Sequence, residues 1–385
     1  MKILKYKIET AHFIVIVSLL SGLFGYGQMK DGAPSETTYS EELDLFGTQL
    51  DSLRRTYKVP GLSVAVVQQD SILFLGGFGY ADFDSERPAI PETTYRIASL
   101  TKPIAATVLM QQVEEGNLSL RDSIKKLVPG YEQYYSEVRD YVLANQPEFA
   151  PMIQDLDFGR DDITVRHHLT HTAENVPGDG FKYNGFLFGA LSRVMEKKLG
   201  LPFHEILENE VLVPCDMGYS APSQERAEEK TLELLARPYE YLVEKDEFVA
   251  SEYPDPDVNA ASGIVSNVID LVKFDRAING NRLIDHETQE TMWTRQRNNA
   301  GEEIPYGLGW FVQHRDGNRA VWHYGWHPEA FSGLYLKFPE SGLTLILLAN
   351  GENLSAPFIE SGYQTDVFAS PFAKLFYDTF LPVTE

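Results

Sequence analysis

The chain has little cysteine and few basic residues, and both shortages exclude classes of protein. Its 385 residues contain a single cysteine, Cys215, which excludes a framework of intramolecular disulfides and any zinc site built mainly from cysteines. The 33 basic residues are outnumbered by 56 acidic ones, so the formal net charge is −23. A protein this acidic repels phosphate backbones, and we therefore expect no nucleic acid among its partners.

The hydrophobic run near the N-terminus is short. Residues 13–24 are nearly all apolar, whereas a membrane-spanning helix needs ~20 apolar residues. The run follows three lysines and precedes two glycines at the positions expected of a cleavage site, and no cysteine stands there to carry a lipid. This order predicts a signal peptide over residues 1–27 and an exported protein, periplasmic or extracellular, with no stable membrane span after cleavage. An uncleaved membrane anchor is the alternative.

The chain also lacks a Gly-x-Ser-x-Gly sequence, which excludes the nucleophile elbow of α/β-hydrolases. It has instead Ser99 followed by Lys102 at the start of an apolar helical pattern. Residues three apart share a helix face, so the Lys102 ammonium can reach the Ser99 hydroxyl. A serine beside an amine that accepts its proton is an activated nucleophile. Ser123 and Lys126 have the same spacing in a polar stretch, so the spacing alone is weak.

The sequence around Ser99 is one of several motifs that stand in the order found in serine hydrolases related to class C β-lactamases. These motifs occupy residues 60–67, 77–82, 95–103, 113–118, 163–172, 261–266, 306–310 and 323–325. From about residue 59 to about residue 350, the chain is therefore similar to the superfamily of serine β-lactamases and penicillin-binding proteins. The resemblance implies an acyl-enzyme on Ser99, with Lys102 beside it, and it implies no cofactor.

The second motif of this family is a Tyr-x-Asn box, which residues 177–185 resemble. Tyr183 falls on the family's tyrosine, and the resemblance implies that its phenol exchanges a proton with Ser99 and with the leaving group. Gly185 stands where the family has asparagine. The carboxamide that helps to hold Lys102 and the substrate is therefore either missing or displaced to Asn184. A tyrosine that only packs is the alternative interpretation of Tyr183.

The third motif, Lys-Thr-Gly in β-lactamases, resembles residues 323–325. His323 replaces the lysine and, being mostly neutral at pH 7, is a poorer anchor for a substrate carboxylate; a histidine that merely packs is the alternative. Gly325 is expected to let a substrate backbone approach closely. Trp326 is expected to supply a second oxyanion N–H beside that of Ser99. His-x-Gly is frequent in the family's esterases and peptidases, which favours them over a dedicated β-lactamase.

Strand patterns near both ends of the chain enclose helical patterns, as expected for an α/β (α+β) fold. Residues 62–67 with 72–78, and residues 333–338 with 343–349, each predict a hairpin. The resemblance implies a β-lactamase-like antiparallel sheet, built from the N- and C-terminal segments and flanked by helices. A helical lobe lies beside this sheet, and the Ser99 site is expected between the two.

The chain is expected to form one catalytic domain after its leader. We predict a flexible lead over residues 28–39 and a hydrolase domain over residues 40–385 that begins with a helix capped by Ser40. Relative to the family, residues 131–162 resemble an insertion, and the loop at residues 173–176 is short. Our hypothesis is that the insertion covers ground that the short loop leaves open. A decoration of the surface is the alternative.

These features together predict an exported serine hydrolase that cleaves small esters, amides or D-amino-acid peptides. Its partner is a small-molecule or peptide substrate, and cell-wall peptides are among the candidates. A β-lactamase or D-alanyl-D-alanine carboxypeptidase is one alternative, and the departures at Glu174 and Gly185 keep open an inactive binder of cell-wall peptides. His167 and His171 are four residues apart, but no glutamate follows His167, so we expect no metal.

Overall fold

The computed structural model describes residues 36–145, 150–254, 257–355, 358 and 365–381. The predicted signal peptide and most of the predicted flexible lead lie outside these residues. The first helix, α1 (Glu36–Thr56), begins before the N-cap expected at Ser40, so the last residues of the predicted lead are helical. No helix in the described part of the chain is long and apolar enough to span a membrane.

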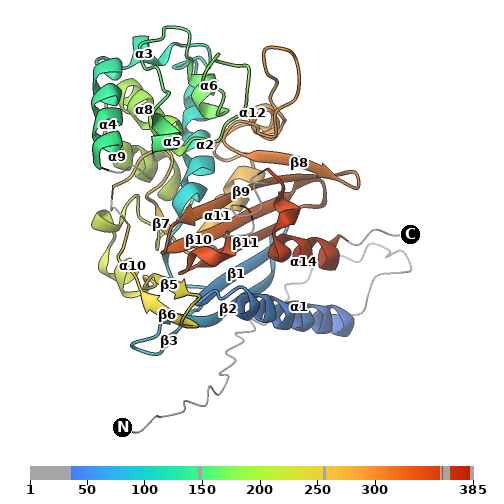
Figure 1. Cartoon of the computed structure of the whole chain (residues 1–385). Helices are drawn as coiled ribbons and strands as arrows, with labels where there is room; N and C mark the ends of the chain where they lie inside the picture. The colour runs from blue at the N-terminus through green and yellow to red at the C-terminus, as the bar shows by residue number, and fades with distance from the viewer. Residues whose placement is uncertain (1–35, 146–149, 255–256, 356–357, 359–364, 382–385) are drawn as a thin grey trace, which may run out of the picture.

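A seven-stranded antiparallel sheet in the order β3-β2-β1-β11-β10-β9-β8 forms the centre of the fold (Figure 1). Its strands are β1 (Gly61–Gln68), β2 (Ser71–Asp82), β3 (Arg87–Pro88), β8 (Phe311–Arg315), β9 (Asn318–His327), β10 (Phe331–Phe338) and β11 (Leu343–Ala349). Strand β1 pairs with β11, and Val64 lies opposite Leu347. The predicted sheet from both ends of the chain is therefore confirmed, as are both hairpins.

Both faces of this sheet are buried. In β1, Leu62, Val64 and Val66 belong to the apolar cluster that includes α1, whereas Ala65 and Val67 belong to the cluster on the opposite side. Successive residues of a strand point to opposite faces, so an almost wholly apolar strand supplies two packed surfaces at once. The fold is consequently a sandwich in which helices cover each face of the sheet.

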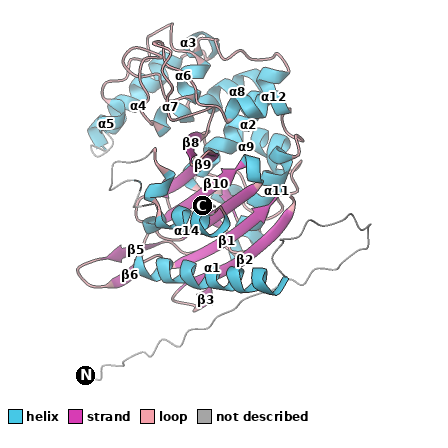
Figure 2. Cartoon of the chain, turned by 90° about the vertical axis from the view of Figure 1, so that its right-hand side faces the viewer, coloured by secondary structure: helices cyan, strands magenta, loops and turns pink. Residues whose placement is uncertain are grey.

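Two groups of helices make up the covering layers. Figure 2 shows α1 and α14 (Pro371–Phe380) together on one face of the sheet. On the other face, α11 (Val268–Asn279) contacts β1 and β11, and α2 (Thr101–Glu114) joins the same apolar cluster. The helical lobe contains α3 (Ile124–Leu127), α4 (Tyr131–Asn145), α5 (Ala150–Ile153), α6 (Val165–Leu169), α7 (Gly185–Gly189), α8 (Leu191–Leu199) and α9 (Phe203–Leu207).

Shorter elements connect these layers. They include two small helices, α10 (Glu229–Glu233) and α12 (His286–Met292), and two small antiparallel sheets, β4 (Tyr95–Arg96) with β7 (Val265–Ser266) and β5 (Tyr239–Leu242) with β6 (Glu247–Ala250). Strand β4 leads directly into the Ser99 region and is therefore the element that matters most for the site.

The segment at residues 131–162 forms α4 and α5 and contributes to the core of the helical lobe. Tyr131 and Tyr135 are buried. The ring of Tyr135 lies 5.5 Å from that of Phe158 and 5.6 Å from that of Phe186, between ring centres. Because Phe186 belongs to α7, this segment packs directly against the helix that follows the predicted Tyr-x-Asn box.

Helix α2 is buried around its circumference because it runs between the sheet and the helical lobe. All residues from Thr101 to Met110 are buried. On one side, Gly309 has a φ of +83°, and a Cβ at this glycine would lie only 2.3 Å from the Cβ of Ala106. Only glycine allows the loop before β8 to approach the helix so closely. The helix that begins beside Ser99 is therefore held firmly by its surroundings.

A buried ion pair connects α11 to the sheet. Asp275 is fully buried and accepts hydrogen bonds from Lys337, from the Tyr335 hydroxyl at 2.6 Å and from Asn279 Nδ2 at 2.9 Å. Lys337 is 1% exposed and also donates to Asn279 Oδ1 at 2.7 Å. Each buried charge thus has partners within the protein, which a buried ion pair requires.

We expect Asp275→Ala to lower the free energy of unfolding by about 3–5 kcal/mol, because it leaves the Lys337 ammonium buried without its carboxylate. Urea unfolding followed by circular dichroism measures the change. Asp44→Ala removes an exposed carboxylate of α1 and serves as the control, with an expected change within about 0.5 kcal/mol. A loss at Asp275 no larger than that of the control would contradict the prediction.

Candidate active site

Ser99 lies in a short 3-10 turn, η1 (Ala98–Leu100), between strand β4 and helix α2. The residue after β4, Ile97, donates its N–H to the Ile264 carbonyl at 3.0 Å. Ala98 has a φ of 47°, a conformation that costs a residue other than glycine about 1–3 kcal/mol. This turn places the partly exposed Ser99 directly before the first turn of α2.

Lys102 projects from the first turn of α2, and its Nζ donates to Ser99 Oγ at 2.8 Å and to the Ala261 carbonyl at 3.1 Å. The same Nζ lies 5.1 Å from the ring centre of Tyr183 and 5.7 Å from that of Phe188. The side chain is 1% exposed, and this desolvation lowers the pKa of Lys102 to about 7. A substantial fraction of Lys102 is therefore neutral near pH 7 and able to accept a proton from Ser99.

Tyr183 lies in the loop before α7 and faces Ser99. Its hydroxyl oxygen is buried and has no hydrogen-bond partner of good geometry in the described part of the chain. Burial raises the pKa of Tyr183 well above its ordinary value, Tyr324 raises it further, and an interaction with the Ser99 side chain opposes the shift. The phenol is therefore protonated at neutral pH, which makes it a proton donor rather than a ready base.

His323 lies on β9 with both ring nitrogens bonded inside the protein. Nδ1 lies 2.7 Å from the Tyr324 carbonyl and so carries the hydrogen, and Nε2 accepts from the Tyr306 hydroxyl at 3.0 Å. The ring is fully buried. Desolvation lowers the pKa of His323 well below its ordinary value, and the nearby Lys102 adds to this shift. His323 is consequently neutral, and neither ring nitrogen is left free to bind a substrate carboxylate.

Gly325 lies where β9 passes closest to the turn that carries the predicted nucleophile. A Cβ at this position would lie 2.5 Å from the Ile97 carbonyl oxygen. The close approach that we expected of a substrate backbone is thus made by the protein's own chain. Trp326 follows Gly325 on β9, and its indole N–H donates to Glu352 Oε2 at 3.1 Å. Trp326 therefore directly follows Gly325, the residue that packs against the Ile97 carbonyl.

Asn184 is buried, and its carboxamide is committed to structural contacts. Its Oδ1 accepts from the Leu187 N–H at 3.2 Å and caps α7. Its Nδ2 donates to the Met152 carbonyl and to Glu174 Oε1, each at 2.8 Å. This corrects the expectation that Asn184 provides a displaced carboxamide for Lys102 and the substrate, because both hydrogens and the oxygen of the amide are already used.

Gly185 occupies the place from which a side chain would touch Lys102. A Cβ there would lie 3.6 Å from Lys102 Nζ and would meet no other atom within 4 Å. The alignment of Gly185 with the family's asparagine therefore agrees with the geometry, and the carboxamide is missing rather than displaced. Among the residues that the structure describes, Lys102 Nζ has two hydrogen-bond acceptors, Ser99 Oγ and the Ala261 carbonyl.

Similarity to known proteins identifies the family of this chain. A family model described as Beta-lactamase matches residues 46–365 of the chain. The chain belongs to the beta-lactamase family. The resemblance inferred from the ordered motifs is therefore confirmed, and with it a fold shared by penicillin-binding proteins and serine hydrolases.

Individual relatives are distant in sequence. Penicillin-binding protein 4* of Bacillus subtilis (strain 168) is 25% identical over 324 residues, which are 79% of this chain and 71% of that protein. Among solved structures, the octameric penicillin-binding protein homologue from Pyrococcus abyssi has a TM-score of 0.66 at 22% identity, covering 89% of this chain and 80% of its own. D-amino acid amidase from Ochrobactrum anthropi SV3 has a TM-score of 0.62 at 20% identity, covering 80% and 91%. At these identities the two structures show a shared fold.

Two histidines of this beta-lactamase-family chain bond to different protein groups. His167 Nδ1 accepts from the Thr164 N–H at 3.2 Å in the cap of α6. His171 Nδ1 accepts from the Asn184 N–H at 3.0 Å, and the ring of His171 lies 4.4 Å from that of Tyr183 between ring centres. His171 is therefore part of the site's surroundings, a position that the sequence analysis did not predict.

Two further direct partners of the site were not predicted from the sequence: the Ala261 carbonyl, which accepts from Lys102, and the Tyr306 hydroxyl, which bonds to His323. Both residues lie in motifs shared with the family, at residues 261–266 and 306–310. Their place in these motifs was the one available signal. Which atom of Ala261 or Tyr306 faces the site depends on the tertiary packing of segments that are far apart in the sequence.

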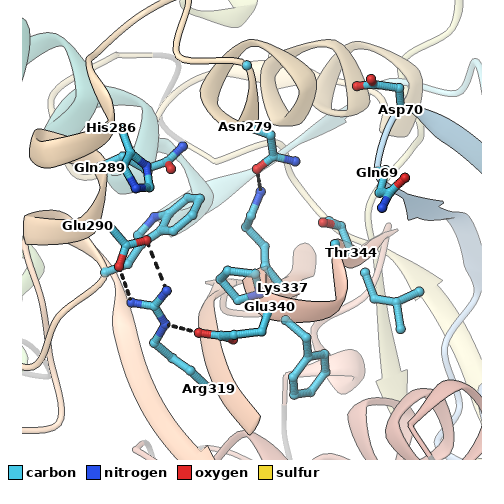
Figure 3. A pocket seen from close by; sticks show the side chains of 16 residues that line it. Gln69, Asp70, Asn279, His286, Gln289, Glu290, Arg319, Lys337, Glu340 and Thr344 are labelled. Atoms are coloured by element: carbon cyan, nitrogen blue, oxygen red, sulfur yellow. Dashed lines mark hydrogen bonds and ion pairs between the residues drawn. The ribbon is translucent and has the colours of Figure 1, made fainter.

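A pocket of about 480 Å³ lies away from Ser99, where α12 meets the ends of β9, β10 and β11 (Figure 3). None of the predicted site residues lines it. Its Arg319 is paired with Glu290 at 2.8 Å and with Glu340 at 3.0 Å, and its Lys337 donates to Asn279. Because its arginine and lysine already have partners, we place the candidate active site at Ser99 instead.

We expect Gly325→Ala to slow reaction at Ser99 by about 10²-fold, because its Cβ would push the Ile97 carbonyl and the adjoining turn out of place. The rate of labelling by a fluorophosphonate measures this effect, with thermal unfolding recorded for each variant. Gly218→Ala is the matched control, since a Cβ there meets nothing within 4 Å. Equal labelling rates in the two variants would show that close packing at Gly325 does not position the nucleophile.

Proposed function

We propose that this member of the beta-lactamase family is an exported serine hydrolase that forms an acyl-enzyme on Ser99 and cleaves small esters, amides or D-amino-acid peptides. The observation that carries this proposal is the 2.8 Å hydrogen bond from a buried Lys102 Nζ to Ser99 Oγ, together with the lowering of the Lys102 pKa to about 7. Export rests on the signal-peptide pattern of residues 1–27.

The reaction begins with neutral Lys102. It takes the Ser99 proton while Oγ attacks the substrate carbonyl carbon and the C=O π electrons move onto oxygen. The backbone N–H groups of Ser99 and Trp326 bind the resulting oxyanion. When the tetrahedral intermediate collapses, the C–O or C–N bond breaks, and Tyr183 gives the leaving group a proton that Lys102 replaces. Water then attacks the acyl-enzyme by the same route and releases the acid.

The pKa directions favour Lys102 over Tyr183 for the first proton transfer. Burial brings the pKa of Lys102 down to about 7 but moves the pKa of Tyr183 well above its ordinary value. At neutral pH the amine is therefore available as a base, whereas the phenol holds its proton and serves as the acid. The open position beside Lys102 at Gly185 also supports this assignment, because no carboxamide there stabilises the ammonium.

The substrate preference follows from His323. A neutral ring whose nitrogens are bonded within the protein gives a β-lactam carboxylate no cation, and a charge-assisted hydrogen bond contributes ~1.5–3 kcal/mol. Small esters, amides and D-amino-acid peptides are therefore preferred over β-lactams. The similarity to a D-amino acid amidase supports amides as one substrate class. β-Lactamase or D-alanyl-D-alanine carboxypeptidase activity and inactive binding of cell-wall peptides are the alternatives.

We expect a fluorophosphonate to label the mature protein at Ser99 and not to label Ser99→Ala, as intact-protein mass spectrometry will show. In a panel of a p-nitrophenyl ester, a D-amino-acid amide, a D-Ala-D-Ala peptide and nitrocefin, an ester, amide or peptide should give the highest kcat/KM, because recognition of a ring carboxylate lacks a cation.

Ser123→Ala, at the second Ser-x-x-Lys match, is the control and should label normally. Labelling that persists in Ser99→Ala would refute the proposed nucleophile. Nitrocefin turnover far above every other substrate would favour a β-lactamase, and the absence of both labelling and turnover would favour an inactive binder.

We expect the acylation rate to rise with pH through about 7, because the neutral form of Lys102 is the base and its pKa is lowered to about 7. Lys102→Ala should lose about 10²–10⁴-fold and Tyr183→Phe no more than that. Pre-steady-state acylation at several pH values measures both variants. A dead Tyr183→Phe protein beside an active Lys102→Ala protein would instead assign the base to the tyrosine.

A further inference from the structure

The carboxylate of Glu174 joins the two chain neighbours of Tyr183. Its Oε2 accepts from Lys182 Nζ at 2.5 Å, and its Oε1 accepts from Asn184 Nδ2 at 2.8 Å. The Glu174 side chain is only 8% exposed, whereas that of Lys182 is 50% exposed. A largely buried carboxylate thus links the side chains of the residues directly before and after Tyr183.

Asn184 extends this connection to two further segments. Its backbone N–H donates to His171 Nδ1 at 3.0 Å, and its Nδ2 also donates to the carbonyl of Met152 at 2.8 Å. Met152 belongs to α5, inside the segment at residues 131–162. The residue after Tyr183 is therefore tied to α5, to His171 and to Glu174 at the same time.

No hydrogen bond between described residues fixes the position of the Tyr183 hydroxyl. The hydroxyl oxygen has no hydrogen-bond partner of good geometry in the described residues, and the ring packs against Phe311 at 5.7 Å and Tyr324 at 5.8 Å between ring centres. The ring of His171 is nearer, at 4.4 Å between ring centres, and all these contacts are to the ring and not to the hydroxyl. The position of its oxygen then depends on the backbone at residues 182–184.

We propose that Glu174 is a positioning residue for Tyr183, which it holds opposite Ser99 by joining Lys182 to Asn184 and, through Asn184, to the segment at residues 131–162. This inference rests on the proposed function, in which Tyr183 protonates the leaving group. It gives a common role to three departures from the family pattern: the short loop that contains Glu174, the extra segment that contains Met152, and the asparagine directly after the tyrosine.

A positioning role has a chemical signature. A poor leaving group needs the proton from Tyr183, whereas p-nitrophenolate departs with little help from an acid. A phenol displaced by about 1 Å can cost a reaction about 10²-fold. Loss of Glu174 should therefore slow an alkyl ester much more than the p-nitrophenyl ester of the same acid, and it should do so in kcat more than in KM.

The experiment compares Glu174→Ala and Glu174→Gln with Glu196→Ala on that pair of esters. Glu196 is the matched control, because its carboxylate likewise joins a cation, Arg193, to a second donor, the Phe203 N–H, and neither of these donors is a chain neighbour of Tyr183. We expect Glu174→Ala to lower the ratio of alkyl to p-nitrophenyl turnover by about 10²-fold. Glu174→Gln keeps an acceptor for Asn184 but loses the one for Lys182, so it should recover part of this loss, and Glu196→Ala should leave the ratio unchanged.

A double-mutant cycle with Tyr183→Phe decides between positioning and general damage. If Glu174 acts through the phenol, Glu174→Ala adds little further loss in the Tyr183→Phe protein. Full additivity, or an equal loss on both esters, would overturn the inference and leave the proposed function standing. If Tyr183→Phe itself leaves the ratio unchanged, the acid role proposed for Tyr183 fails, and this inference fails with it.

Discussion

A lysine amine held out of water against a serine hydroxyl is the interaction on which the rest of this structure depends. Lys102 is 1% exposed, and two hydrogen-bond acceptors and two aromatic rings surround its nitrogen. An ammonium in such a place is unfavourable, so burial lowers the pKa of Lys102 from its ordinary value of 10.5 to about 7. The low pKa of Lys102 thus follows from burial.

That burial sets the architecture around it. Lys102 stays out of water because α2, the helix that carries it, has the sheet on one side and the helical lobe on the other. Ser99, the proposed nucleophile, lies partly exposed where the chain turns sharply at η1, at which Ala98 takes a positive φ and Gly325 leaves room for the Ile97 carbonyl. A strained residue, Ala98, and a close backbone approach, at Gly325, therefore lie directly beside Ser99.

The departures from the family pattern also make sense as one arrangement. Gly185 removes a side chain beside Lys102, and Asn184 turns its carboxamide toward α5 and Glu174. No carboxamide at residue 185 stabilises the Lys102 ammonium, and the residue after Tyr183 is bonded on several sides. These features agree with a neutral lysine and a protonated phenol, the pairing that the proposed reaction uses.

The sequence alone determined what depends on local spacing. Ser99 and Lys102 meet because residues three apart share a helix face, and both hairpins arise from short turns between apolar strands; the order of motifs identified the family and its sheet. The tertiary structure decided what depends on distant partners. Asn184 meets Met152 from 32 residues away and His323 meets Tyr306 from 17 residues away, and the neighbour of Gly325 is Ile97. A sequence shows which groups can form hydrogen bonds, but only the packed fold shows which of those bonds are already made.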